Sequence, residues 1–94
     1  MIARVTSVQV APNKLEEAIR SIEPALAAVK AAPGFKSALF LADRTTGKAT
    51  MTSVWESEAA MQESLSLRQE ALAQVAPLLV GAVTTETYEV LAQV

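Results

Sequence analysis

The sequence of 94 residues contains neither cysteine nor histidine. Because cysteine is absent, the chain can form no disulfide, no thiolate nucleophile and no thiolate metal site. Because histidine is absent, it lacks the commonest general base and the usual protein ligand of haem iron. Carboxylates are present, but no two of them have a spacing in the sequence that indicates a catalytic pair. Any chemistry must therefore rely on arginines and on a few aromatic side chains.

Charge and long apolar runs are also scarce. The net charge is −2 and no basic stripe appears, which argues against a nucleic-acid partner. No stretch approaches the ~18 consecutive apolar residues that would span a bilayer, so no membrane partner is expected. The N-terminal MIARVTSVQV lacks the layout of a signal peptide, and we expect a cytoplasmic location. The length predicts one domain over residues 1–94, small enough to gain stability from oligomerisation.

Segments rich in β-branched residues alternate with segments that carry apolar residues at helical spacing. One helix is predicted from Asn13 to about Ala32, and a second from Ser57 to about Pro77. Strands are predicted at residues 2–10, 35–43, 49–56 and 83–91. This order predicts an α+β, ferredoxin-like βαββαβ fold, in which a four-stranded antiparallel sheet carries the helices on one face.

Capping residues, proline and glycine mark the ends and interruptions of these segments. Asn13 is expected to cap the first helix, with Glu16 at the acid position of a capping box. Pro24 removes a backbone donor and is expected to kink the helix or restart it. In the RTTGK turn of the predicted hairpin, Gly47 is expected to be left-handed. Ser57 is expected to cap the second helix.

The second strand is apolar on both sides. Leu39 and Leu41 alternate with Ala38 and Phe40, yet helices can cover only one face of the sheet. An exposed apolar sheet face normally marks an interface. We therefore predict a homodimer that forms through the open sheet face.

The stretch PGFKSALFLADRTTGKATMTSVWESEAAM, residues 33–61, resembles the core motif of the antibiotic biosynthesis monooxygenase family. ARV at residues 3–5 and TYEV at residues 87–90 are similar to the family's first and last strands. The resemblance implies a dimeric α/β barrel. Its members include cofactor-free oxygenases of phenolic polyketides, quinol oxygenases, haem-degrading enzymes and proteins of unassigned function.

The resemblance also bears on single residues. It implies that Trp55 stands where the oxygenases have a tryptophan that lines the pocket. Met51 stands where the polyketide oxygenases resemble one another in having asparagine, so a polar group able to hold a substrate hydroxyl is missing. The haem-degrading members use a histidine ligand that this chain lacks.

Four residues are the candidate catalytic residues: Trp55, Arg68, Arg4 and Tyr88. Trp55 either forms a pocket wall that stacks on a flat aromatic substrate or packs in the core at the end of a strand. Arg4, on a central strand, either holds an anionic substrate or enolate or pairs with a carboxylate such as Glu86.

The other two candidates also have two interpretations. Arg68 interrupts the apolar stripe of the second helix. Its head either points into a cavity between helix and sheet or reaches water from the core edge. Tyr88 either donates a hydrogen bond or acts as a weak base, or it packs on its neighbours in the sheet.

Two functional hypotheses follow. The first is a cofactor-independent monooxygenase that acts on a small aromatic or quinol-type substrate and needs neither cofactor nor metal. The second is a non-catalytic dimeric domain that binds a small apolar ligand or only itself. An open, polar-lined cavity above ~300 Å³ beside Trp55 would favour the first hypothesis, and an interior filled by side chains would favour the second.

Overall fold

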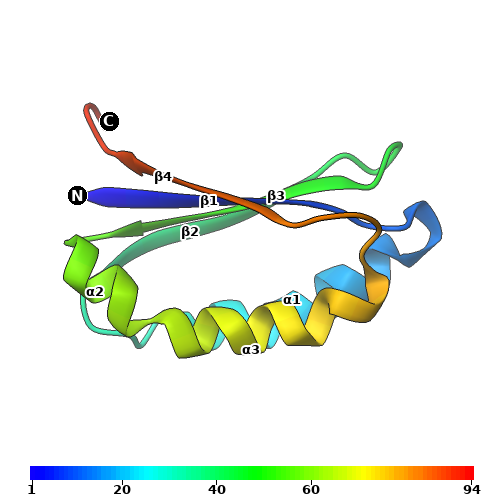
Figure 1. Ribbon diagram of the computed structural model, residues 1–94, viewed down its shortest axis with the longest axis horizontal. Helices are drawn as coiled ribbons and strands as arrows, with labels where there is room; N and C mark the ends of the chain where they lie inside the picture. The colour runs from blue at the N-terminus through cyan, green and yellow to red at the C-terminus, as the bar shows by residue number, and fades with distance from the viewer.

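The computed structural model describes all of residues 1–94 as a four-stranded antiparallel sheet with its helices on one face (Figure 1). The strands stand in the order β2-β3-β1-β4, with β1 and β3 in the centre. This arrangement confirms the predicted α+β, ferredoxin-like fold. The strands are β1 (Ile2–Gln9), β2 (Phe35–Ala42), β3 (Lys48–Trp55) and β4 (Thr84–Glu89). The helices are α1 (Leu15–Val29), α2 (Glu58–Glu63) and α3 (Leu65–Val75), with 3-10 turns η1 (Pro12–Lys14) and η2 (Ala76–Leu78).

The β2–β3 hairpin closes through the turn that the sequence predicts. The Asp43 amide donates to the Lys48 carbonyl, and the Gly47 amide donates to the Asp43 carbonyl, each at 2.8 Å. Gly47 has a φ of 79°. A side chain there would place its Cβ 2.2 Å from the carbonyl oxygen of Val10. Glycine is therefore needed both for the left-handed backbone and for the close approach of β1.

The start of the first helix differs from the prediction. Asn13 lies inside η1, and no side chain caps either η1 or α1. Pro12 begins the 3-10 turn, in which the Lys14 amide donates to the Ala11 carbonyl at 2.8 Å. This backbone bond closes the 3-10 turn in place of a side-chain cap. The Glu16 carboxylate instead forms an ion pair with Arg44.

The helices contain one interruption, and it is not the predicted one. Helix α1 continues past Pro24 without restarting, and the proline ring faces solvent. The predicted second helix is divided at Ser64, which has φ −87° and ψ 2°. The Ser64 hydroxyl donates to the Met61 carbonyl at 2.6 Å and so satisfies an acceptor at the end of α2. Ser57 does cap α2, because its side chain accepts the Ala60 amide at 3.2 Å.

The apolar core lies between the sheet and the helices. One buried cluster gathers where β1 ends and α1 begins, and another joins α1 to α3. Their members are Val10, Leu15, Ala18 and Ala49 in the first cluster, and Ile22, Ala71 and Val75 in the second. At the Trp55 end of the sheet, by contrast, buried polar residues share the interior. The functional site is therefore sought at that end.

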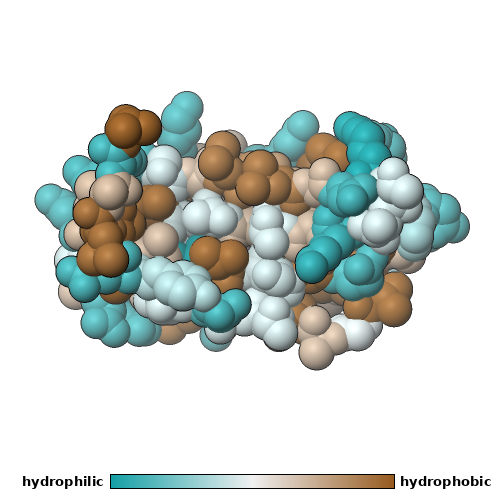
Figure 2. Space-filling model, turned by 90° about the horizontal axis from the view of Figure 1, so that it is seen from above, coloured by the Kyte–Doolittle hydropathy of each residue, from teal (hydrophilic) through white to brown (hydrophobic).

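The other face of the sheet is open. Leu39, Leu41 and Tyr88 are 60%, 52% and 50% exposed. Figure 2 shows this face, with hydrophobic groups across its middle among weakly polar residues and hydrophilic groups gathered at its two ends. None of the helices combines the length and the apolar character needed to cross a bilayer.

Candidate functional site

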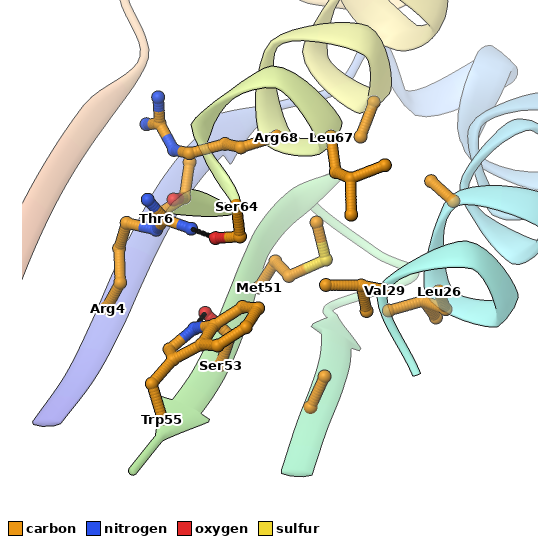
Figure 3. A pocket seen from close by; sticks show the side chains of 13 residues that line it. Arg4, Thr6, Leu26, Val29, Met51, Ser53, Trp55, Ser64, Leu67 and Arg68 are labelled. Atoms are coloured by element: carbon orange, nitrogen blue, oxygen red, sulfur yellow. Dashed lines mark hydrogen bonds between the residues drawn. The ribbon is translucent and has the colours of Figure 1, made fainter. Parts of the chain in front are cut away.

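A cavity of about 40 Å³ lies beside Trp55, between the sheet and helices α1 and α3 (Figure 3). Eight of its 13 lining residues are hydrophobic. The polar residues that line it are Arg4, Thr6, Ser53, Ser64 and Arg68. Figure 3 shows both arginines on the β1 side of the cavity, opposite Val29 and Leu26 of α1. The site is thus an apolar chamber with one cationic wall.

Trp55 is fully buried and forms part of the cavity wall. Its ring meets the ring of Phe35 edge to face, with centroids 5.5 Å apart and planes at 78°. Its indole N–H donates to the Ser53 hydroxyl at 3.0 Å. This bond uses the only hydrogen-bond donor of the indole. Trp55 therefore packs in the core, as one of its two interpretations predicts, and it is also one of the residues that line the cavity. Stacking of its ring on a substrate stays a prediction.

Strand pairing brings the polar residues of the sheet together. Arg4 stands opposite Ser53 in the β1–β3 register, and Thr6 stands opposite Met51. Because side chains alternate along a strand, these four residues point to the same face of the sheet. That face is covered by the helices, so Arg4 is only 8% exposed.

The break at Ser64 joins the second helical segment to this cluster. Ser64 is buried, and its hydroxyl accepts a hydrogen bond from Arg4 Nη2 at 3.4 Å, which is long for such a bond. One turn further on, Arg68 extends toward β4, where its Nη2 donates to the Thr85 hydroxyl. The Nε of Arg68 is buried and has no partner.

The contact between α2 and the sheet depends on a glycine. Gly34 has a φ of 80°, and its carbonyl accepts the Glu56 amide at 2.7 Å. A Cβ at Gly34 would lie 2.5 Å from the Cβ of Ala60. The Pro-Gly-Phe motif therefore lets α2 lie against the ends of β2 and β3.

Positive charge is concentrated in the cavity. Arg4 and Arg68 are the only charged residues among those that line it. Burial lowers the pKa of Arg4 below its usual value, and the charge of Arg68 lowers it further. The one ion pair in the structure, between Arg44 and Glu16, lies on the surface.

The structure has no group of three or more acidic, histidine or cysteine side chains placed to hold a metal ion.

The structure separates Tyr88 from the other three candidates. In the β1–β4 register Tyr88 stands opposite Ala3, and Arg4 stands opposite Thr87. Tyr88 therefore points to the open face, where its hydroxyl donates to the Glu86 carboxylate at 2.5 Å. The predicted pairing of Arg4 with Glu86 is wrong for the same reason, because their side chains lie on opposite faces.

Sequence reasoning missed the small hydroxyl residues of the site. Thr6, Ser53 and Ser64 all line the cavity, yet none was a candidate. Ser64 carried a usable signal, since serine inside a helical pattern favours a cap or a break. For Thr6 and Ser53 the signal was their position beside Arg4 and Trp55 at a strand period of two residues.

The family model described as antibiotic biosynthesis monooxygenase matches residues 1–82. The chain therefore belongs to the antibiotic biosynthesis monooxygenase family. No curated protein matches the chain.

Solved structures share the fold at low sequence identity. A proposed antibiotic biosynthesis monooxygenase from Caulobacter crescentus is 22% identical, with a TM-score of 0.86 over 97% of this chain and 90% of that one. A proposed antibiotic biosynthesis monooxygenase from Nitrosomonas europaea is 12% identical, with a TM-score of 0.87 over 98% and 100%. A mutant of SnoaB, a cofactor-independent oxygenase from Streptomyces nogalater, is 19% identical, with a TM-score of 0.74 over 98% and 94%.

Proposed function

We propose that the chain is a cofactor-independent monooxygenase that acts on a small aromatic or quinol-type substrate in the cavity beside Trp55. The observation that carries the proposal is the buried indole, which presents an apolar wall next to a cationic one. Membership of the family supports it, as does the likeness to SnoaB, which is a cofactor-independent oxygenase.

The cavity offers two elements that such a reaction needs. In a cofactor-free monooxygenation the substrate itself supplies the electrons. One oxygen atom enters the substrate, and the other leaves as water with two hydrogens from the substrate. Release of a ring-hydroxyl proton to solvent makes the substrate a better electron donor, and a fixed positive charge stabilises the resulting anion. Arg4 and Arg68 supply that charge, while Trp55 supplies a stacking surface.

The size of the cavity requires movement before a substrate binds. Its volume of about 40 Å³ is far below the ~300–1,000 Å³ that encloses most small-molecule ligands. An aromatic ring can therefore enter only if lining side chains are displaced. Met51 is suited to this, because it lines the cavity and its unbranched side chain has three rotatable bonds. The break at Ser64 is the place where α3 can shift relative to α2.

Oxygen consumption tests the proposal. We expect the protein to consume oxygen with at least one member of a panel of hydroquinones and anthrones. Trp55→Phe and Arg68→Gln should lower the rate at least tenfold, whereas Arg20→Gln, on the exposed side of α1, should leave it unchanged. A folded wild-type protein with no uptake above buffer across the panel would refute the proposal.

By its size the cavity favours the second candidate function, because about 40 Å³ lies well below the ~300 Å³ expected for the oxygenase. This second candidate is a non-catalytic domain that binds a small apolar ligand. This alternative predicts that aromatic ligands change the emission of Trp55 while no oxygen is consumed. The two measurements on the same protein sample separate the candidates.

Homodimerisation through the open sheet face is part of the proposed function. Leu39, Leu41 and Tyr88 expose apolar surface on this face, and a second sheet would cover it (Figure 2). We expect sedimentation equilibrium at micromolar concentration to give the mass of two chains. The mass of one chain at that concentration would refute the dimer.

A further inference from the structure

Arg4 is a largely buried cation that makes a single hydrogen bond within the protein, and its other nitrogens keep some accessible surface, because Arg68 Nε is the only fully buried nitrogen without a partner. Its side chain is 8% exposed, and its one hydrogen bond is the long contact with Ser64 at 3.4 Å. A guanidinium carries five N–H donors, so most of them lack a partner within the protein. Buried arginines are normally paired, because an uncompensated charge in the interior is costly.

Arg68 adds a second positive charge to the same wall. Its Nε is buried without a partner, although its Nη2 reaches the Thr85 hydroxyl. No aspartate or glutamate lines the cavity. Arginine cannot escape the resulting repulsion by losing its proton, because a guanidinium stays protonated in proteins. The two side chains therefore form a preassembled cationic site that has no counter-ion of its own.

We infer that Arg4 and Arg68 bind a carboxylate, and that the ligand of this cavity is an aromatic acid. The unused N–H groups of Arg4 are donors that a carboxylate accepts in charge-assisted hydrogen bonds, and Arg68 adds a second positive charge on the same wall. The cavity volume of about 40 Å³ exceeds the ~10–15 Å³ that a single water requires, so a small polar group can enter it. An attached aromatic ring requires the displacement of lining side chains.

A second copy of the chain cannot supply the missing negative charge through the open face. Arg4 points to the helix-covered face, whereas the acidic Glu86 of the neighbouring strand points to the open face. A partner that packs on the open face is separated from Arg4 by the sheet itself. A small anionic ligand that enters the cavity can supply the counter-ion from the helix-covered side.

A matched pair of probes tests this inference, which rests on the proposed function only for its location. Benzoate and benzamide have nearly the same shape, but only benzoate is charged. Titration at neutral pH, followed by Trp55 emission and by calorimetry, should show benzoate binding at least tenfold more tightly than benzamide. Arg68→Gln should weaken benzoate binding at least tenfold and leave benzamide binding nearly unchanged. Equal affinity for the two probes, or no effect of Arg68→Gln, would overturn the inference.

Two controls keep the result separate from folding and from catalysis. Arg20→Gln removes a positive charge from the exposed face of α1. This variant should bind benzoate with the affinity of the wild-type protein. Arg4→Met should lose the preference for benzoate over benzamide. If this variant does not fold, Arg68→Gln still tests the anion site, because Arg68 is only partly buried. Benzoate binding without oxygen uptake on any substrate would refute the oxygenase but support the anion site. Oxygen uptake with neutral hydroquinones that benzoate does not inhibit would support the oxygenase and overturn the anion site.

Discussion

The two faces of the sheet are built from the same strands, but the inner face lacks a negative charge and the outer face lacks an apolar cover. On the face beneath the helices, Arg4 is buried with no carboxylate near it. On the open face, Leu39 and Leu41 are exposed with no side chain to cover them. A buried cation needs an anion, and an exposed apolar face needs another apolar surface. Under the two proposals, a small ligand would complete the inner face and a second chain would complete the outer one.

The largest expected effect is on the inner face. Trp55→Ala should lower the free energy of unfolding by about 3–5 kcal/mol, because it removes a fully buried aromatic ring and its contact with Phe35. That is a large share of the ~5–15 kcal/mol that stabilises a typical domain. Urea unfolding at one fixed protein concentration measures the change, since dimerisation would make stability depend on concentration.

Val54→Ala is the matched control, because Val54 is the neighbour of Trp55 on β3 and points to the outer face. It should cost about 1 kcal/mol. Equal losses for the two variants would mean that the inner face is not the more tightly packed one.

The next effect concerns the outer face. Leu39→Glu and Leu41→Glu should each raise the dissociation constant of the dimer at least about tenfold, because each would place a charge in an apolar interface. Sedimentation equilibrium measures the constant. Ser66→Glu adds the same charge to the exposed side of α3 and should leave the dimer intact. Dimers of unchanged affinity in both leucine variants would place the interface elsewhere.

Much of the fold could be predicted from local patterns. The apolar periodicities identified the strands and α1, and Gly47 and Ser57 adopt the conformations that their residue types favour. The prediction failed at Asn13 and at Ser64, where several local solutions compete. Pro12 favoured a 3-10 turn over a side-chain cap, and the bond between Ser64 and Met61 ended α2 early.

The candidate site was less predictable, because it depends on which face of the sheet each side chain joins. Arg4, Trp55 and Arg68 meet around one cavity, but Tyr88 and Glu86 lie on the other face. That distinction requires the register between β1 and β4, which a single sequence does not specify. A shift of one residue would have exchanged the two sets.

A smaller effect tests the charge of the inner face. Arg4→Met should raise the free energy of unfolding by about 1 kcal/mol, because it removes a desolvated charge beside Arg68 and keeps most of the side-chain volume. The same variant should lose its preference for benzoate over benzamide. Urea unfolding measures the gain, and Arg20→Met on the exposed side of α1 should change stability by less than about 0.5 kcal/mol. A loss of stability in Arg4→Met would show that Arg4 acts mainly as a packing residue.

The smallest effect is a titration on the outer face. The hydrogen bond from Tyr88 to Glu86 raises the pKa of the Tyr88 phenol, with smaller contributions from burial and from the Glu86 charge. Glu86→Gln should lower that pKa toward its ordinary value. Tyr88 is the only tyrosine, so the ultraviolet absorbance of phenolate follows it directly.

Because the fold favours the protonated phenol, Tyr88 adds stability below pH ~10, and this contribution is lost as the pH rises through the raised pKa of the folded state. Arg4→Met is the control on the opposite face and should leave the titration unchanged. If Arg4→Met moved the Tyr88 pKa as far as Glu86→Gln does, the two faces would be electrostatically coupled, and the separate roles assigned to them would fail.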